Sequence, residues 1–146
     1  MSVLSDSHRK TISVYGLGYV GCVSAVCLAS LGHRVIGVDI NPDKVESVGR
    51  GIAPIIEDRI GELTAQVVSS GALTVTTDAE FALLHSDVAL ICVGTPSGPT
   101  GELSTRYLEQ VTAELGAALA RTDTWHTLVY RSTMLPGTCG NLLIPK

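Results

Sequence analysis

The stretch Gly16-Leu17-Gly18-Tyr19-Val20-Gly21 has the spacing G-x-G-x-x-G, and its flanks decide what that spacing means. Before it runs KTISVY, from Lys10 to Tyr15, a β-rich segment. After it comes the apolar run VGCVSAVCLASL, from Val20 to Leu31, which has the length of a helix. A bare match occurs by chance, but a strand before and a helix after are the context in which this spacing binds a dinucleotide. The stretch therefore predicts a strand, a tight glycine turn and a helix.

Each glycine of the turn has its own predicted task. Gly16 allows the tight turn, and Gly18 lets the backbone approach a pyrophosphate with no Cβ in the way. Gly21 lets the helix pack close to the strand. The unpaired N–H groups at the start of the helix then face the phosphates.

Strands and helices alternate along the rest of the chain. The expected strands are Lys10 to Tyr15, His33 to Ile40, Leu73 to Thr76, Asp87 to Val93 and Thr127 to Tyr130. The first expected helix, Val20 to Leu31, has an apolar stripe through Val23, Val26 and Cys27 and ends at Gly32. The second begins at the cap Asn41-Pro42-Asp43 and ends in the glycines Gly49 and Gly51. The remaining helices are expected at Ile60 to Ser69, at Ser104 to Arg121 and from Pro136 onward. This alternation predicts an α/β fold, a Rossmann-type doubly wound parallel sheet. The chain stops within the last expected helix, so we expect the sheet to be truncated at its C-terminal side.

Composition restricts the classes of partner. Of 146 residues 45% are hydrophobic and 16% charged, which is typical of a folded domain rather than a disordered chain. The net charge of -4 argues against nucleic acid and anionic membranes, and no apolar run approaches the roughly 18 residues of a membrane span. Residues 1–9 are expected to form a flexible extension with no signal-peptide pattern, and 10–146 the folded domain. Cys22, Cys27, Cys92 and Cys139 are scattered, which is typical of reduced thiols in a cytoplasmic protein.

Asp39, at the end of the second expected strand, specifies the dinucleotide. Its carboxylate is placed to accept hydrogen bonds from the adenosine ribose, and its charge would repel a 2′-phosphate, so the sequence predicts NAD rather than NADP. Lys44 lies one helical turn further on. A FAD site, or a glycine turn that binds nothing, are the alternatives.

Four motifs together resemble the N-terminal domain of the UDP-glucose/GDP-mannose dehydrogenase family. They are VYGLGYVG from Val14 to Gly21, GHRVIGVD from Gly32 to Asp39, CVGTP from Cys92 to Pro96, and RSTMLPGT from Arg131 to Thr138. They follow the family's order and cover nearly everything from Lys10 to Lys146. The last motif and the segment from Ile52 to Glu57 look nearest to GDP-mannose 6-dehydrogenases, with UDP-glucose 6-dehydrogenases next.

The resemblance implies a reaction and a set of residues. Such enzymes use two NAD to oxidise C6 of a nucleotide sugar to a uronic acid for polysaccharide biosynthesis, through a thiohemiacetal on a catalytic cysteine. The family pattern implies that Thr133 also helps to position the hydrolytic water, and that Thr95 lies beside the cofactor. The cofactor residues implied by the glycine motif and the family together are Gly16, Gly18, Tyr19, Val20, Gly21, Asp39, Lys44, Thr95 and Thr133.

The chain also departs from the family. Glu57 is followed by Asp58-Arg59 where the family continues with proline, so the contact made by this loop is open. The catalytic cysteine and the rest of the substrate half lie beyond Lys146 in relatives, and Cys139, inside the NAD domain, is not that nucleophile. We therefore expect a cofactor domain that is not catalytic alone and meets its nucleotide sugar through the missing domain. A stand-alone NAD(H)-binding module is the alternative.

Two further expectations follow. The unpaired sheet edge left by truncation predicts self-association, and relatives of this kind imply a homo-oligomer. The four histidines, His8, His33, His85 and His126, are isolated and have no metal-ligand spacing, so no metal site is predicted. Asp6, Asp43, Glu57 and Asp58 are expected to be surface or capping acids.

Overall fold

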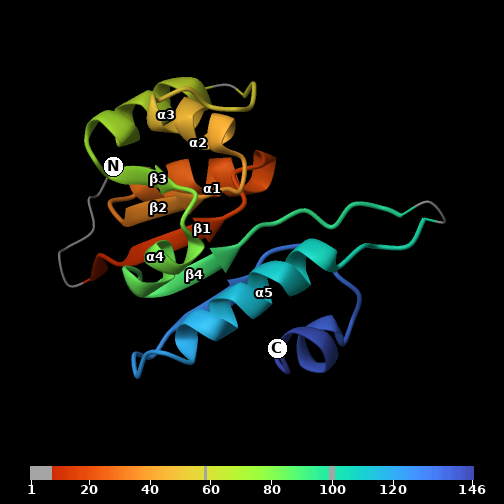
Figure 1. Ribbon diagram of the computed structural model, residues 1–146. Coiled ribbons are helices and arrows are strands. Elements are labelled where there is room, and N and C mark those ends of the chain that lie inside the picture. The colour runs from red at the N-terminus through yellow and green to blue at the C-terminus, as the bar shows by residue number, and fades with distance from the viewer. Residues whose placement is uncertain (1–7, 58, 99–100) are drawn as a thin grey trace.

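The structure is a computed structural model that describes residues 8–57, 59–98 and 101–146. Residues 1–7 of the expected N-terminal extension, with Asp6, lie outside the described residues, and so does Asp58. The centre is a parallel sheet in the order β3-β2-β1-β4-β5 (Figure 1). Its strands are β1 (Thr11–Tyr15), β2 (Arg34–Val38), β3 (Leu73–Thr76), β4 (Val88–Ile91) and β5 (Thr127–Tyr130).

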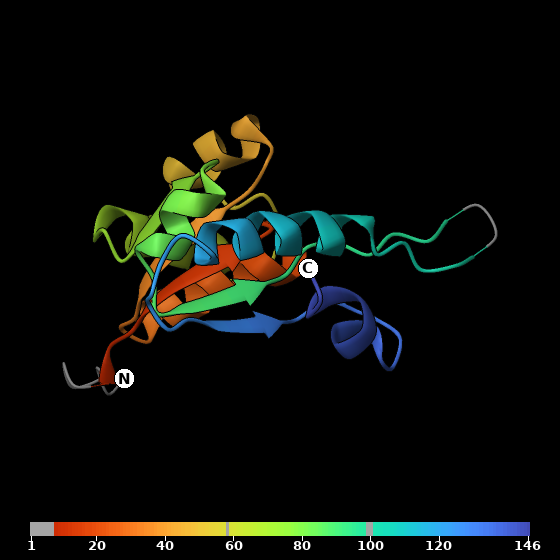
Figure 2. The same ribbon diagram turned by 60° about the horizontal axis from the view of Figure 1, so that its bottom comes forward.

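Helices cover both faces of this sheet, as the alternation predicted. On one face lie α1 (Tyr19–Ser30), α2 (Pro42–Gly49) and α3 (Ile60–Ser69), and on the other α4 (Ala79–Leu84), α5 (Arg106–Leu119) and the C-terminal helical segment η2 (Cys139–Leu143) (Figures 1 and 2). The doubly wound parallel fold is thereby confirmed.

Alternation along β1 shows how the sheet is buried on both faces. Val14 packs among α1 and α3, whereas its neighbour Tyr15 packs among α4 and α5. Val14 lies opposite Gly37 of β2 and Leu90 of β4 in the register. The order of the strands reverses at β1, because β2 and β3 lie on one side of it and β4 and β5 on the other. A crevice at such a reversal, beyond the carboxyl ends of the strands, is where open α/β sheets bind ligands.

The local signals at the helix ends are confirmed. The Asn41 side chain accepts hydrogen bonds from the backbone N–H of Asp43 and Lys44, and Pro42 opens α2. Gly32, just after α1, has φ +105°, the left-handed conformation that closes a helix at little cost to glycine.

The structure differs from the sequence-based expectations in three features. Helix α4 is present where no helix was expected, and Asp78 caps it by accepting from the N–H of Phe81. The last helical segment begins at Cys139 rather than Pro136, because Gly137 has φ +87°, and it is a π-type turn. Cys27 lies exposed, since α1 turns Cys22, Ala25, Val26 and Ala29 toward the core instead.

A long arm separates β4 from α5. Its two sides, residues 94–98 and 101–105, run away from the sheet next to each other (Figures 1 and 2). An antiparallel bridge joins Ser97 to Leu103. This arm contains the Gly- and Pro-rich loop that the sequence excluded from the strand.

Candidate dinucleotide site

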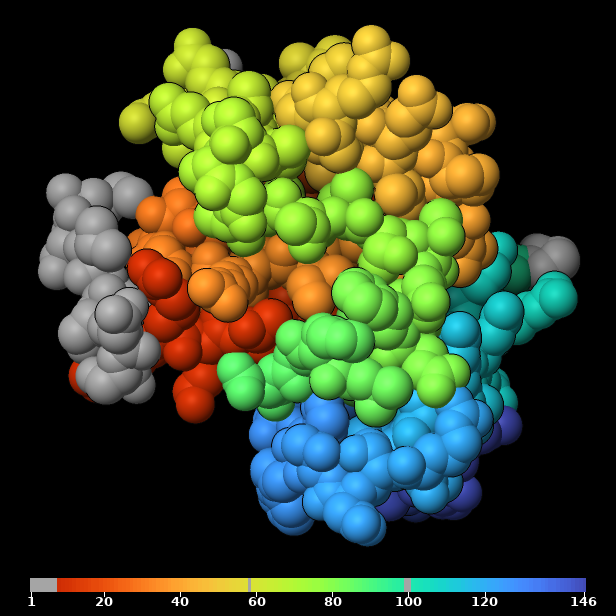
Figure 3. Space-filling model, turned by 60° about the vertical axis from the view of Figure 1, so that its left-hand side comes forward, coloured from red at the N-terminus to blue at the C-terminus, as the bar shows by residue number. Residues whose placement is uncertain are grey.

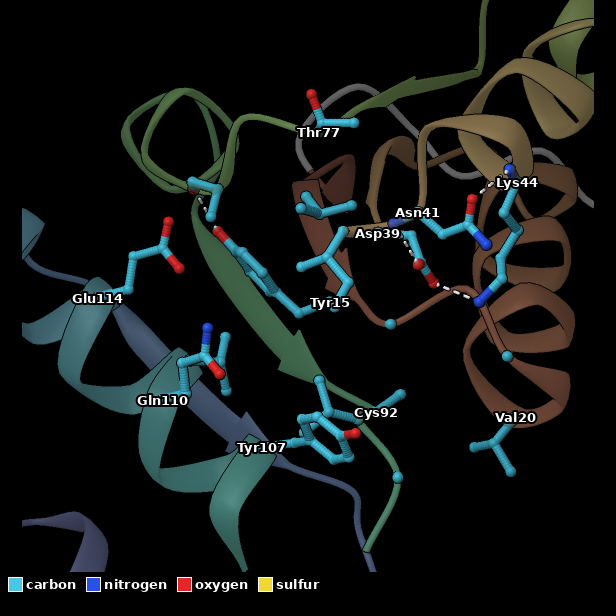
Figure 4. Close-up of a pocket in the computed structure, with 18 of the residues that line it drawn as sticks. Tyr15, Val20, Asp39, Asn41, Lys44, Thr77, Cys92, Tyr107, Gln110 and Glu114 are labelled. Carbon is cyan, nitrogen blue, oxygen red and sulfur yellow. Dashed lines mark hydrogen bonds and ion pairs between the residues drawn. The ribbon is translucent and has the colours of Figure 1, made fainter. Parts of the chain in front are cut away.

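A pocket of about 580 Å³ lies at the strand reversal. One side is the glycine loop and the start of α1, with Gly16, Gly18, Tyr19 and Val20. The floor is the end of β4, and the opposite side is α5 (Figure 4). The sequence predicted this position from the motif and the parallel sheet.

The three motif glycines differ in what surrounds them. A Cβ on Gly21 would lie 1.7 Å from the carbonyl oxygen of Gly16, so α1 packs on the strand turn at a distance that no other residue permits. Gly16 has φ +90°, and a Cβ there would lie 3.0 Å from the carbonyl oxygen of Cys92. A Cβ on Gly18 would meet nothing within 4 Å. Gly21 is thus needed by the fold, whereas Gly18 leaves its open space to whatever enters the pocket.

Asp39 is buried at the end of β2 and is held by three donors. Its Oδ2 accepts from the N–H of Leu17 at 2.8 Å and from Lys44 Nζ at 2.8 Å, and its Oδ1 accepts from the N–H of Asn41 at 3.0 Å. Burial by itself would raise the pKa of Asp39, but the bond and charge of Lys44 and the two backbone N–H groups outweigh it, and the pKa lies below its ordinary value. Asp39 is therefore an anion, and it ties β2 to the glycine loop.

Lys44 has a more specific place than its sequence position indicated. It lines the pocket while paired with Asp39, and its side chain is partly exposed (Figure 4). The ammonium group of Lys44 and the carboxylate of Asp39 therefore lie side by side in the lining of the pocket.

Tyr19 contacts the loop whose role the sequence left open. Its hydroxyl donates a hydrogen bond to Glu57 Oε1, so Glu57 is an exposed acid, as expected, and also bonds to α1. This bond raises the pKa of Tyr19, which keeps the phenol protonated. The segment before α3 is thereby joined to the first residue of α1.

Thr95 and Thr133 lie next to each other, and neither is among the residues that line the pocket. Thr95 Oγ1 donates to the carbonyl oxygen of Thr133 at 2.8 Å, across the ends of β4 and β5. Arg131, in the same motif as Thr133, donates from Nη1 to Ser24 Oγ of α1 at 2.9 Å. The loop after β5 is therefore bonded both to the loop after β4 and to the helix of the glycine motif.

Several lining residues were not predicted from the sequence. Cys92 lies on the floor, and burial raises the pKa of its thiol against the opposing effect of Arg131. Thr77 follows β3, and four residues of α5 form the far wall. The apolar stripe of α5 was visible in the sequence, but its exposure to a pocket depends on how α5 crosses the sheet.

A second, polar hollow of about 640 Å³ lies at the amino-terminal ends of the strands, on the side of the sheet away from the first pocket. Its lining includes His33, Arg34, Ser70 and His85, and Figure 3 looks onto this side, with β1 and β2 between α3 and α4. Within the described residues, no group of three or more His, Cys, Asp or Glu side chains could hold a metal ion. None of the helices in the same residues is long and apolar enough to cross a bilayer.

A parallel sheet of this order, with a glycine loop and a buried acid on one pocket, defines a dinucleotide-binding domain of the Rossmann class. Residues 10–145 match the model of the UDP-glucose/GDP-mannose dehydrogenase family, NAD binding domain. The chain belongs to this family and corresponds to its NAD-binding domain.

Individual relatives agree with this assignment. GDP-mannose 6-dehydrogenase of Azotobacter vinelandii is 46% identical over 134 residues, which are 92% of this chain and 31% of that protein. The solved ternary complex of GDP-mannose dehydrogenase from Pseudomonas aeruginosa is 48% identical with a TM-score of 0.90, over 92% of this chain and 31% of that one. UDP-glucose dehydrogenase of Pyrobaculum islandicum is 40% identical with a TM-score of 0.92, over 99% of this chain and 34% of that one. The chain spans about a third of the length of these relatives.

Proposed function

We propose that this chain binds NAD as the cofactor domain of a nucleotide-sugar 6-dehydrogenase. The observation that carries the proposal is the meeting of Gly18 and Asp39 on one pocket. The open space at Gly18 fits a pyrophosphate at the start of α1, and the Asp39 anion fits the ribose beside it. Gly16, Tyr19, Val20 and Lys44 would complete this half of the site, with Gly21 holding its helix in place. When bound, NAD supplies the hydride acceptor.

The substrate of the whole enzyme is proposed to be GDP-mannose, whose C6 alcohol would be oxidised to a uronic acid with two NAD. The support is the 46–48% identity to GDP-mannose dehydrogenases. UDP-glucose is the second candidate, supported by the TM-score of 0.92 to a UDP-glucose dehydrogenase at 40% identity. The nucleotide sugar would be bound through the further domain. The product would enter polysaccharide biosynthesis in the cytoplasm, and the enzyme would be a homo-oligomer.

Thr95 and Thr133 are proposed to face the nicotinamide half of NAD. The pocket beside Asp39 takes the adenosine half, so the nicotinamide would extend over the ends of β4 and β5, where the two threonines are bonded to each other. Thr133 would assist in positioning the hydrolytic water.

The chain by itself is proposed not to catalyse the oxidation. A covalent thiohemiacetal needs a thiolate at the sugar, and the thiols of this chain are placed for other roles. Cys22 is buried, Cys27 lies on the outer side of α1, and Cys92 lines the cofactor pocket with a raised pKa. Cys139 Sγ contacts Met134 Sδ at 3.4 Å in the C-terminal segment.

Calorimetric titration of the chain with NAD and with NADP tests cofactor binding. Saturable NAD binding, weaker NADP binding, and loss of NAD binding in Asp39→Ala are expected, and binding of neither would reject the proposal. The role as a cofactor domain is tested by joining the chain to the substrate domain of a GDP-mannose 6-dehydrogenase and following NADH formation with GDP-mannose. NADH formation is expected, and a folded chimera that binds NAD but forms no NADH would reject this role.

A further inference from the structure

One face of α5 forms the pocket wall opposite Asp39. Tyr107, Gln110, Val111 and Glu114 follow the spacing i, i+3, i+4, i+7, and all four line the pocket. We call these four residues the α5 wall. In Figure 4 Gln110 and Glu114 project from α5 toward Tyr15, with Asp39 and Lys44 on the far side.

The wall lies where the base of the dinucleotide would be. The glycine loop takes the pyrophosphate and Asp39 the ribose, so the base extends into the remaining space of the pocket. Val38, Ile40, Ala79 and Val111 line this space with apolar surface. A flat heterocycle fits between such residues, and its polar edge must then face the polar groups that remain.

Gln110 and Glu114 supply those groups. In the part of the chain that the structure describes, neither side chain has a hydrogen bond or an ion pair to another residue. The nearby Tyr15 hydroxyl does not satisfy Glu114, because it donates to the carbonyl oxygen of Ala79 at 3.0 Å. Burial raises the pKa of Tyr15 to about 12, and the negative charge of Glu114 adds to this effect. The Glu114 side chain is exposed to solvent, and its carboxylate is therefore an acceptor without a protein partner at the edge of the apolar part of the pocket.

We propose that Glu114, with Gln110 beside it, determines specificity for adenine by accepting a hydrogen bond from the 6-amino group. The inference rests on the proposed NAD binding. An ionised carboxylate can accept but not donate, so it favours a 6-amino purine and opposes a 6-oxo purine, whose oxygen would face it. Gln110 can donate to N1 of adenine from the same wall.

The test uses NAD and nicotinamide hypoxanthine dinucleotide, which differ at position 6 of the purine. Titration of the chain should show NAD binding about tenfold more tightly, a ratio of the size that one charge-assisted hydrogen bond gives. In Glu114→Gln the ratio should fall to near one, because the amide can donate to the 6-oxo group. The matched control is Glu109→Gln on the same helix. The Glu109 carboxylate accepts from Thr105 at 2.9 Å and pairs with Lys146 at 3.1 Å outside the pocket, so this variant should keep the wild-type ratio.

The outcomes separate this inference from the proposed function. Saturable binding of both dinucleotides with equal affinity by the wild-type chain would overturn the role of Glu114 and leave the NAD site standing. A wild-type ratio that persists in Glu114→Gln would also overturn it. Binding of neither dinucleotide would reject the proposed function itself. Circular dichroism of both variants shows that the fold is kept, as expected for substitutions on the surface of α5.

Discussion

Replacing Asp39 by Asn should cost stability as well as cofactor affinity. Asp39 Oδ2 accepts from the N–H of Leu17 and from Lys44 Nζ, whereas Oδ1 accepts from the N–H of Asn41. An Asn amide has one acceptor oxygen, so either orientation turns its NH₂ group toward a donor in a buried place. The loss of a charge-assisted bond and an unpaired buried N–H together are expected to lower the free energy of unfolding by about 2–4 kcal/mol. Urea unfolding at pH 7 measures this as a midpoint lowered by roughly 1–2 M.

The pH dependence gives a second reading of the same substitution. The folded-state pKa of Asp39 is lowered, so its carboxylate stabilises the fold above the unfolded-state pKa of about 3.9, and the contribution is lost as the pH falls through the folded-state value. The difference between wild type and Asp39→Asn should be complete at pH 7 and should shrink below about pH 4. Asp43→Asn, an exposed acid in the first turn of α2, is the control for charge and should change stability by less than about 1 kcal/mol. An Asp39→Asn chain that unfolds within about 0.5 kcal/mol of wild type would refute the reasoning, since measured hydrogen-bond contributions are larger.

Three other perturbations separate packing, chemistry and assembly. Gly21→Ala is expected to prevent folding or to lower the midpoint of thermal unfolding severely. Gly18→Ala should fold with an unchanged midpoint and should lose NAD binding in a titration. The reverse pattern would contradict the roles assigned to the two glycines. Iodoacetamide should label the exposed Cys27 first, and bound NAD should slow the labelling of Cys92 in the pocket. Mass spectrometry follows the labelling of each thiol. Equal labelling of Cys92 with and without NAD would place this thiol away from the cofactor. In the described residues β5 pairs with β4 on one side alone, which leaves its other edge unpaired. The chain should therefore self-associate in sedimentation, and Val129→Lys on β5 should reduce the association. A wild-type chain that stays monomeric at high concentration would contradict this prediction.

The sequence predicted the parts of this fold that depend on neighbours along the chain. The Asn41 cap, the stop at Gly32 and the limits of α3 match the structure because hydrogen bonds within a few residues determine them. The limits of β3 match as well, although its pairing is with the distant strand β2. Helix α4 was missed because its six residues are too few for a helical period to emerge, although the Asp78 cap was a usable signal. The α5 wall could not be predicted, because nothing in a helix sequence says which side of its apolar stripe meets a pocket rather than the core.

The two halves of the predicted dinucleotide site are physically one unit. The motif glycines and Asp39 are read from the sequence as separate contacts, one for the pyrophosphate and one for the ribose. In the structure the Asp39 carboxylate also accepts from the N–H of Leu17, inside the glycine loop, at 2.8 Å. A substitution at Asp39 would therefore remove the proposed ribose acceptor and also release the loop that is proposed to receive the pyrophosphate. Lys44→Met leaves both backbone bonds to Asp39 in place, so comparing its NAD affinity with that of Asp39→Asn separates the loss of the loop anchor from the loss of the ion pair.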